Sequence, residues 1–188
     1  MSTAKSSSGD LPTGLTVDEF LAWADGRPGR YELHEGAVVM MSPETVGHLR
    51  AKADVFLALR DAIARSERLC HVLPDGATVR TSSKMAFEPD ALVYCGEALD
   101  DASMEVPAPV IVVEVLSPST QRIDVGRKLA AYFSIASVMH YLIVNPGNPP
   151  LVHHQRQSDG TILTRLVSSG TTRLDPPGLD LDVERCFA

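Results

Sequence analysis

The most constraining feature of this sequence is an unbroken apolar run that ends in a carboxylate. Val110 to Val113 is uninterrupted by any polar residue, and Glu114 follows it directly. Consecutive branched apolar residues predict a strand that is buried on both faces and lies at the centre of a sheet. An ionised carboxylate at the end of such a strand is costly unless it is paired or bound to a metal. The fold must therefore accommodate a charged group beside its core.

Three helices are expected around this strand. Thr16 and Glu19 have the spacing of a capping box, which predicts a short helix to about residue 24. Ser42, with Pro43 at the first helical position, predicts a long helix over residues 44–66. Its predicted apolar face carries Leu49, Ala53, Phe56 and Ile63. Residues 123–136 form the third expected helix, with Tyr132 in the core.

The remaining patterns predict strands separated by turns. Pro74, Asp75 and Gly76 form a good turn signal between the runs 69–73 and 77–81, which predicts a hairpin. The expected strands are residues 30–34, 37–41, 69–73, 77–81, 90–95, 110–116, 138–145, 151–155 and 161–166. This order of helices and strands favours an α/β fold with a mixed β-sheet flanked by helices.

The size and ends of the chain fit one domain. A chain of 188 residues is long enough for one substantial core, so we expect a Ser-rich disordered tail over residues 1–13 and a single domain over residues 14–188. The purely apolar runs, such as 37–41 and 110–113, are too short to cross a membrane. Residues 1–12 also lack the apolar middle region of a secretory signal.

The cysteines and the net charge narrow the function classes. Cys70, Cys95 and Cys186 are odd in number and widely spaced, which predicts neither a disulfide framework nor a thiolate metal site, so a cytoplasmic location is expected. The 17 Lys and Arg against 24 Asp and Glu give a net charge of -7, which argues against a protein that coats nucleic acid. A metal-dependent nuclease remains compatible, because such an enzyme concentrates carboxylates at its site.

Two further charged residues stand in suggestive positions. Asp90 follows Pro89 and opens another expected strand, so Asp90 and Glu114 can lie at the ends of neighbouring strands and hold Mg²⁺. Lys128 lies on the helix that follows Glu114, with Asp124 one turn before it. Each residue also has an ordinary structural explanation: Asp90 as a turn residue, and Lys128 with Asp124 as an exposed ion pair.

In combination these segments resemble the Uma-two (Uma2) family, a bacterial restriction-endonuclease-like family of the PD-(D/E)XK nuclease superfamily. The resemblance spans about residues 16–152 and rests on residues 31–36, on Met41 to Pro43 with His48 downstream, on Pro89 and Asp90, on the segment 113–120, and on Asp124, Lys128 and Tyr132. It implies a restriction-endonuclease-like mixed sheet flanked by helices.

The resemblance also implies roles for particular residues. Asp90 and Glu114 would be the metal ligands, with the carbonyl of Val115 as a third, and Lys128 would supply the catalytic ammonium. Leu116 occupies the place where the superfamily has its lysine, so Lys128 is a substitute from the next helix. Glu32 matches an early glutamate of the family, although an exposed carboxylate on an edge strand is an equally good interpretation.

The implied function is hydrolysis of DNA phosphodiester bonds with Mg²⁺, for which Mn²⁺ could substitute. DNA is then the expected partner, and a homodimer is compatible with cutting two strands. The first alternative is a degenerate nuclease fold that binds nucleic acid or a protein without cutting. The second is a small-molecule hydrolase, which is disfavoured because no nucleophile and base pair is visible. We expect His48 to be structural rather than to line the site, and His153 and His154 to lie at the surface of a peripheral strand.

Overall fold

A computed structural model describes residues 11–116 and 124–187, and the side chains of residues 124 and 125 are also outside the description. The predicted segment Ser117 to Thr120 therefore lies outside the described residues, as do the predicted tail up to residue 10 and the side chain of Asp124. Among the described residues, no helix has both the length and the apolar character that crossing a membrane requires.

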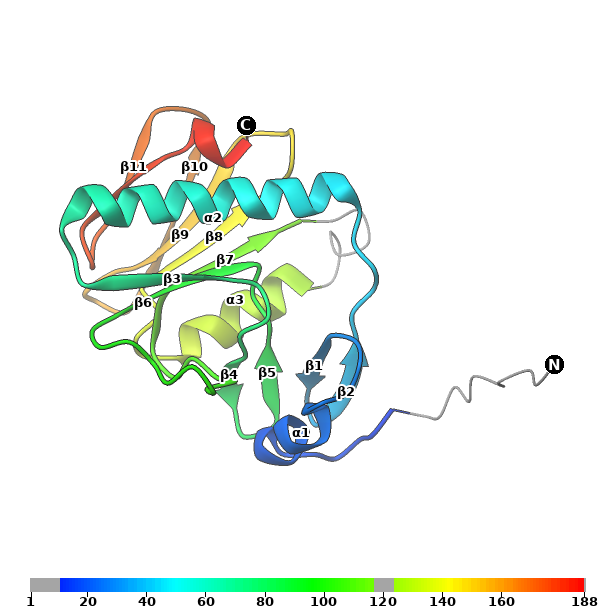
Figure 1. The fold of residues 1–188 in the computed structure, drawn as a ribbon. Helices are drawn as coiled ribbons and strands as arrows, with labels where there is room; N and C mark the ends of the chain where they lie inside the picture. The colour runs from blue at the N-terminus through cyan, green and yellow to red at the C-terminus, as the bar shows by residue number, and fades with distance from the viewer. Residues whose placement is uncertain (1–10, 117–123, 188) are drawn as a thin grey trace.

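A six-stranded mixed sheet forms the centre of the fold, which confirms the predicted α/β class. Its strand order is β10-β9-β8-β7-β6-β3 (Figure 1). The apolar run predicted as the central strand is β7, which pairs antiparallel with β6 and parallel with β8. The strands of this sheet are β3 (Cys70–Pro74), β6 (Ala91–Cys95), β7 (Pro109–Val115), β8 (His140–Val144), β9 (Leu151–Arg156) and β10 (Ile162–Val167).

One helix covers each face of this sheet (Figure 1). The helix α2 (Val46–Ser66) shares a core cluster with Ile111, Val113 and Val115 of β7. The helix α3 (Asp124–Ser134) shares a second cluster with Val112. Because side chains alternate along a strand, Glu114 falls on the α3 side of the sheet. This alternation determines which helix can reach its carboxylate.

A smaller, four-stranded sheet lies beside the large one, with the order β2-β1-β5-β4. The predicted capping box is confirmed, because Thr16 and Glu19 satisfy each other's backbone N–H groups at the start of α1 (Val17–Ala24). The strands of the smaller sheet are β1 (Tyr31–His34), β2 (Ala37–Met40), β4 (Val79–Ser82) and β5 (Met85–Phe87). The first of these is an inner strand between β2 and β5, which positions Glu32 away from the edge.

The C-terminal region contains elements that the sequence did not predict. The strands β11 (Thr171–Leu174) and β12 (Leu179–Asp182) form a two-stranded sheet, and the short 3-10 helix η1 spans Glu184–Phe187. Leu174, Leu179 and Leu181 are buried in the core cluster that contains α2. The last segment of the chain therefore closes the α2 side of the fold.

Two predictions about local structure were wrong. The runs around Pro74 to Gly76 are strands but not a hairpin, because β3 pairs with β6 in the large sheet and β4 pairs with β5 in the small one. The long helix is capped by Thr45 rather than Ser42, since the Thr45 hydroxyl accepts a hydrogen bond from the backbone N–H of His48 at 3.2 Å. A local turn signal cannot specify which strands pair afterwards.

The apolar face predicted for the long helix was wrong in part, since Ile63 packs against the core as predicted but two other residues do not. Leu49 is half exposed and Ala53 is exposed. The face that packs on the sheet consists of Ala51, Lys52, Val55, Ala58, Leu59 and Ala62. One of the residues on this buried face is thus a lysine.

The interpretation of the cysteines requires a correction. Cys70 on β3 and Cys95 on β6 are register partners in the antiparallel pair, and they form a disulfide. Cys186 is buried and free. Spacing along the chain concealed this pair because the two cysteines meet only through strand register.

Candidate active site

Asp90 and Glu114 come from neighbouring antiparallel strands at the same end of the large sheet. Asp90 immediately precedes β6, and its backbone N–H donates to the carbonyl of Val113 at 3.0 Å. Its Oδ2 accepts a hydrogen bond of 2.6 Å from the backbone N–H of Val115. Asp90 is therefore fixed to the backbone on both sides of Glu114. The two predicted ligands lie close together because strand pairing requires it.

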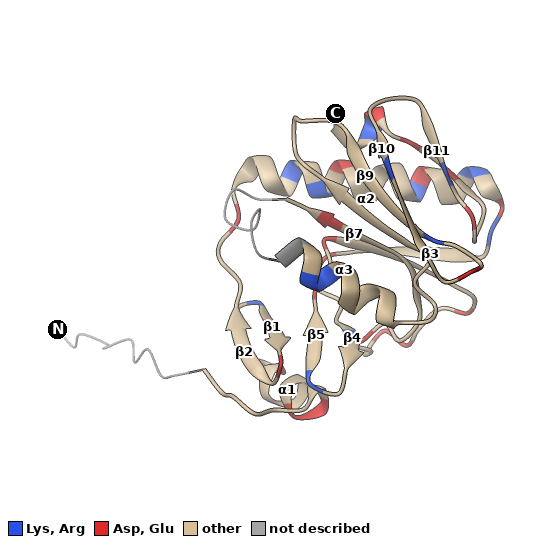
Figure 2. Cartoon of the chain, turned by 180° about the vertical axis from the view of Figure 1, so that it is seen from behind, with Lys and Arg blue, Asp and Glu red and all other residues tan. Residues whose placement is uncertain are grey.

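Lys128 joins Glu114 to Glu32 across the two sheets. Its Nζ lies 3.1 Å from Glu114 Oε1 and 3.0 Å from Glu32 Oε1. Lys128 is only 7% exposed, and its ammonium lies 5.2 Å from the centroid of the Phe87 ring. It is a buried group between two carboxylates, so the alternative of an exposed helix-face lysine does not apply. Figure 2 shows basic positions on α3 beside the acidic position at the end of β7.

Glu32 is held at both carboxylate oxygens. Its Oε2 accepts from His34 Nε2 at 2.9 Å, and its Oε1 also accepts from the backbone N–H of Glu88 at 3.2 Å. Burial alone would raise the pKa of Glu32, but its contacts with His34 and Lys128 outweigh that effect and lower it. Glu32 is thus a buried, ionised carboxylate rather than a solvated one on an edge strand.

Tyr132 is fully buried, which confirms its predicted place in the core, and it also contacts the site. Its hydroxyl donates to Glu114 Oε1 at 2.7 Å. Burial and the neighbouring carboxylate of Glu114 raise the pKa of Tyr132 well above its usual range, so this hydroxyl remains a donor. Oε1 of Glu114 therefore accepts from both Tyr132 and Lys128, whereas Oε2 has no hydrogen-bond partner among the described residues.

Glu114 carries the strongest sign of unbalanced negative charge. Burial, together with the neighbouring carboxylates of Asp90 and Glu32, raises its pKa to about 7 against the opposing effect of Lys128. The side chain keeps 12% exposure. An additional positive charge close to Glu114 would stabilise its ionised form.

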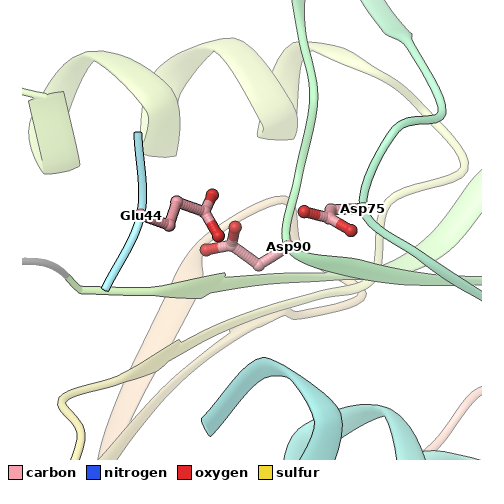
Figure 3. A group of neighbouring side chains, drawn as sticks. All are labelled: Glu44, Asp75 and Asp90. Carbon is pink, nitrogen blue, oxygen red and sulfur yellow. The ribbon is translucent and has the colours of Figure 1, made fainter. Parts of the chain in front are cut away.

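A second group of charges adjoins Asp90, and sequence reasoning missed it. Glu44, Asp75 and Asp90 come from three separate segments and point toward one another, with one oxygen of each within 4.8 Å of the others (Figure 3). Lys52 Nζ lies among them, 2.7 Å from Asp90 Oδ1 and 2.9 Å from Asp75 Oδ2, and it also contacts Glu44 Oε1. Burial by itself would lower the pKa of Lys52, but the three carboxylates raise it, so Lys52 is charged.

Arg30 completes the charge balance of this second group. Its guanidinium lies 2.8 Å from Glu44, 2.7 Å from Asp75 and 3.0 Å from Glu88. Burial opposes the charged forms of Glu44 and Asp75, yet the contacts with Lys52 and Arg30 lower the pKa of both carboxyl groups. The group is thus an ion-pair network with two cations of its own. An interpretation of α2 that placed Lys52 on the buried face would have predicted buried carboxylates near it, but not which ones.

His48 is closer to the site than expected. Its Nε2 lies 2.8 Å from the carbonyl oxygen of Val115, which the sequence predicted as a metal ligand. A carbonyl only accepts hydrogen bonds, so Nε2 carries the proton in this contact. Nδ1 of His48 faces Glu44 Oε2 at 3.5 Å, and within the described part of the chain neither atom has a hydrogen-bond partner.

The prediction for His153 and His154 was wrong. Both are buried, and the strand that carries them lies between β10 and β8 rather than at the periphery. Neither makes a contact with the acidic site among the described residues.

The donor atoms around Glu114 fit a hard divalent cation. Mg²⁺ prefers one or two carboxylates together with water and phosphate oxygens, and it keeps several waters. Asp90 and Glu114 supply such carboxylates, Glu114 Oε2 has no partner among the described residues, and a cation would relieve the excess negative charge at Glu114. The carbonyl of Val115 fits less well, because one of its two lone pairs already accepts from His48.

Comparisons with known proteins identify a family and a fold. A family model, Uma2, described as "Putative restriction endonuclease", matches residues 17–185. Two proteins from Synechocystis sp. (strain ATCC 27184 / PCC 6803 / Kazusa) are similar in sequence. The uncharacterized protein slr1290 is 24% identical over 191 residues, covering 96% of this chain and 95% of that protein. The uncharacterized protein sll1609 is 25% identical over 156 residues, covering 81% and 88%.

One solved structure has a closely similar fold. It is the crystal structure of a putative nuclease belonging to DUF820 from Anabaena variabilis ATCC 29413, which matches with a TM-score of 0.70 over 92% of this chain and 97% of that chain. The sequence identity is 15%, so the likeness concerns the fold.

Proposed function

The chain belongs to the Uma2 family of restriction-endonuclease-like proteins, and from this premise we propose that it is a Mg²⁺-dependent endonuclease that hydrolyses phosphodiester bonds of DNA. The observation that carries the proposal is the convergence of two strand-end carboxylates and a buried lysine, since Lys128 contacts Glu114 and Asp90 is bonded to the adjacent backbone. The structural relative from Anabaena variabilis is described as a putative nuclease, which supports the same reaction class.

In this proposal Asp90 and Glu114 hold the metal, and the Val115 carbonyl is an additional donor if it shares its oxygen with His48. A bound Mg²⁺ supplies Lewis-acid polarisation of the phosphate and a water of lowered pKa. Asp90 is oriented for its role by the Val115 N–H, and Glu114 by Tyr132 and Lys128. These fixed contacts keep both carboxylates in place before any ligand arrives.

Lys128 is the proposed catalytic cation. Its ammonium is held between Glu32 and Glu114, so it can stabilise negative charge that develops on the phosphate and can orient the attacking water. Glu32 keeps this ammonium charged and fixed in position. In this role Glu32 acts on the reaction through Lys128.

A second candidate, a nuclease-like fold that binds without cutting, is favoured by one observation. Asp90 Oδ1 already pairs with Lys52, and the Val115 carbonyl already accepts from His48, so two of the proposed donors are engaged by the protein itself. Binding of a divalent cation would have to compete with these contacts.

A cleavage assay separates the two candidates. Purified protein is incubated with supercoiled, linear and single-stranded DNA, and with RNA, in Mg²⁺ or Mn²⁺. We expect cleavage of at least one DNA form and its abolition by EDTA. Cleavage that persists in excess EDTA contradicts the metal mechanism. Absence of cleavage under all conditions, with retained DNA binding, favours the second candidate.

A further inference from the structure

The carboxylates Glu44, Asp75 and Asp90 surround one ammonium group of the protein itself. Lys52 Nζ contacts an oxygen of each, and its side chain is 7% exposed. Three carboxylate oxygens within 4.8 Å of one another are a spacing that a metal ion could use. Here the position is filled by Lys52, and Arg30 pairs with two of the same carboxylates. The cage that Glu44, Asp75 and Asp90 form around Lys52 is therefore not a second metal site.

Asp90 links this cage to the proposed metal site. Its Oδ2 accepts from the Val115 N–H and its Oδ1 pairs with Lys52, so both oxygens have a partner within the protein. Glu114 differs, since one of its oxygens has no partner among the described residues. A divalent cation that uses Oε2 of Glu114 leaves the contact of Oε1 with Lys128 in place, whereas at Asp90 it meets two oxygens that are already engaged, one of them by an ammonium.

Lys52 can release Asp90 without becoming an isolated buried charge. Glu44 and Asp75 remain as partners if its contact with Asp90 lengthens. An uncompensated buried ammonium is strongly unfavourable, whereas one that keeps two carboxylates is not. The cage thus gives this lysine an alternative position at low cost.

We propose that Lys52 is a positioning residue that acts as the internal counter-ion of Asp90: it holds this carboxylate when no divalent cation is bound, and it competes with the cation when one binds. The inference rests on the proposed function, because it takes Asp90 and Glu114 as the metal ligands. Its consequence is that the protein weakens its own metal affinity in exchange for an ordered metal-free site.

The test measures Mn²⁺ binding by titration calorimetry, together with melting temperature, on the full chain. Lys52→Met removes the ammonium and keeps most of the side-chain volume. We expect a lower melting temperature without metal, and a dissociation constant for Mn²⁺ reduced about tenfold, which corresponds to about 1.4 kcal/mol. The matched control Lys84→Met removes an exposed lysine and should leave the dissociation constant unchanged. An unchanged or increased dissociation constant in Lys52→Met overturns the inference.

A second pair of variants decides the matter if Lys52→Met does not fold. Glu44→Gln removes the charge of one alternative partner of Lys52 but can still accept from it, and its amide can donate to the free Nδ1 of His48. Glu88→Gln neutralises a nearby carboxylate that pairs with Arg30 and not with Lys52. We expect Glu44→Gln to weaken Mn²⁺ binding more than Glu88→Gln does. Equal effects overturn the inference.

Glu114→Gln distinguishes failure of this inference from failure of the proposed function. If wild type binds Mn²⁺ and Glu114→Gln does not, the metal assignment is supported, and the Lys52 variants then test the inference alone. If both bind with the same dissociation constant, or neither binds, the metal assignment fails and the inference fails with it.

Discussion

Two buried polar clusters lie at opposite ends of the same parallel strand pair, and they solve the problem of burial in different ways. Glu114 lies near the C-terminal end of β7, opposite Ile143 of β8. His140 lies at the N-terminal end of β8, opposite Ile111 of β7. The first cluster consists of ionised groups matched with opposite charges, and the second consists of imidazoles that are kept neutral.

The histidine cluster is a directional chain of hydrogen bonds. His140 Nε2 lies 2.8 Å from the Pro176 carbonyl, so it must donate, and its Nδ1 is then an acceptor. His153 Nε2, 2.9 Å from that Nδ1, therefore donates to it. The Thr172 hydroxyl, 3.3 Å from His153 Nδ1, completes the chain as a donor. Each ring nitrogen has a partner only while both rings are neutral.

The comparison teaches that the two clusters respond to pH with opposite sign. Burial lowers the pKa of His140 to about 4 and that of His153 to about 3. The two neutral rings therefore contribute fully to stability above the pKa of histidine in the unfolded chain, about 6.5, and this contribution falls as the pH decreases below that value. The pKa of Glu114 is raised to about 7, so the folded protein favours its protonated form. Its contribution to stability therefore falls as the pH rises from about 4.5 to 7. Of these two clusters, the one where chemistry is proposed is charged, and the other is neutral.

The largest expected effect comes from removing the charge at the centre of the acidic cluster. Lys128→Met should reduce DNA cleavage by about 10² to 10⁴-fold, the usual range for loss of a positioned catalytic group. Mn²⁺ binding should survive, because Lys128 acts on phosphate and water rather than on the ion. Single-turnover cleavage and titration calorimetry on the same protein preparation measure the two quantities.

Leu116→Ala is the matched control for this variant, since Leu116 occupies the place of the superfamily lysine and packs against the α3-side core. It should lower stability with little effect on the chemical step. Cleavage by Lys128→Met at the wild-type rate would mean that the lysine is only a structural ion-pair partner.

The histidine cluster should make the protein sensitive to acid. Below pH 6.5 each of His140 and His153 should reduce the free energy of unfolding by about 1.4 kcal/mol per pH unit, until its folded pKa is reached. Glu114 opposes this slope in the same range, so Glu114→Gln is the appropriate background. Urea denaturation at pH 7, 6 and 5 should give a loss of about 1.4 kcal/mol between pH 7 and 6 and about 2.4 kcal/mol between pH 6 and 5 there.

His153→Gln sharpens the test. A glutamine amide can still donate to His140 Nδ1, but it does not titrate. In the Glu114→Gln background it should reduce the pH dependence to about half. A slope equal to that of the parent would contradict the assignment of the acid sensitivity to these rings.

Much of the architecture could be predicted from local pattern. The central strand follows from Val110 to Val113 because only a covered strand tolerates such a run, and the capping box at Thr16 is a purely local structure. The proximity of Asp90 and Glu114 was predicted from their positions at the ends of neighbouring strands, whereas the site roles of Glu32 and Lys128 came from the family resemblance. Spacing alone left Lys128 as an exposed helix residue.

The missed features depend on contacts between distant segments. The disulfide and the histidine chain arise from strand register, which joins Cys70 to Cys95 and His140 to His153 only after the sheet has formed. Lys52 was missed because the predicted apolar face of α2 was offset from the buried one. A lysine on a buried helix face requires carboxylate partners from other segments of the chain. No local sequence pattern identifies those partners.

The smallest expected effect tests whether the neutral chain depends on its terminal donor. Thr172 is buried on β11, and its hydroxyl is the only donor to His153 Nδ1 among the described residues. Thr172→Val keeps the shape and leaves Nδ1 unsatisfied, so it should reduce the free energy of unfolding by about 1 kcal/mol at pH 7. Thr172→Ser keeps the hydroxyl and loses a methyl group, so it should leave the hydrogen bond intact. The nitrogen chemical shifts of His153 should change in the valine variant and remain close to those of wild type in the serine variant. If urea denaturation shows no loss for valine and the chemical shifts do not move, the hydroxyl does not hold this tautomer, and burial alone keeps the rings neutral.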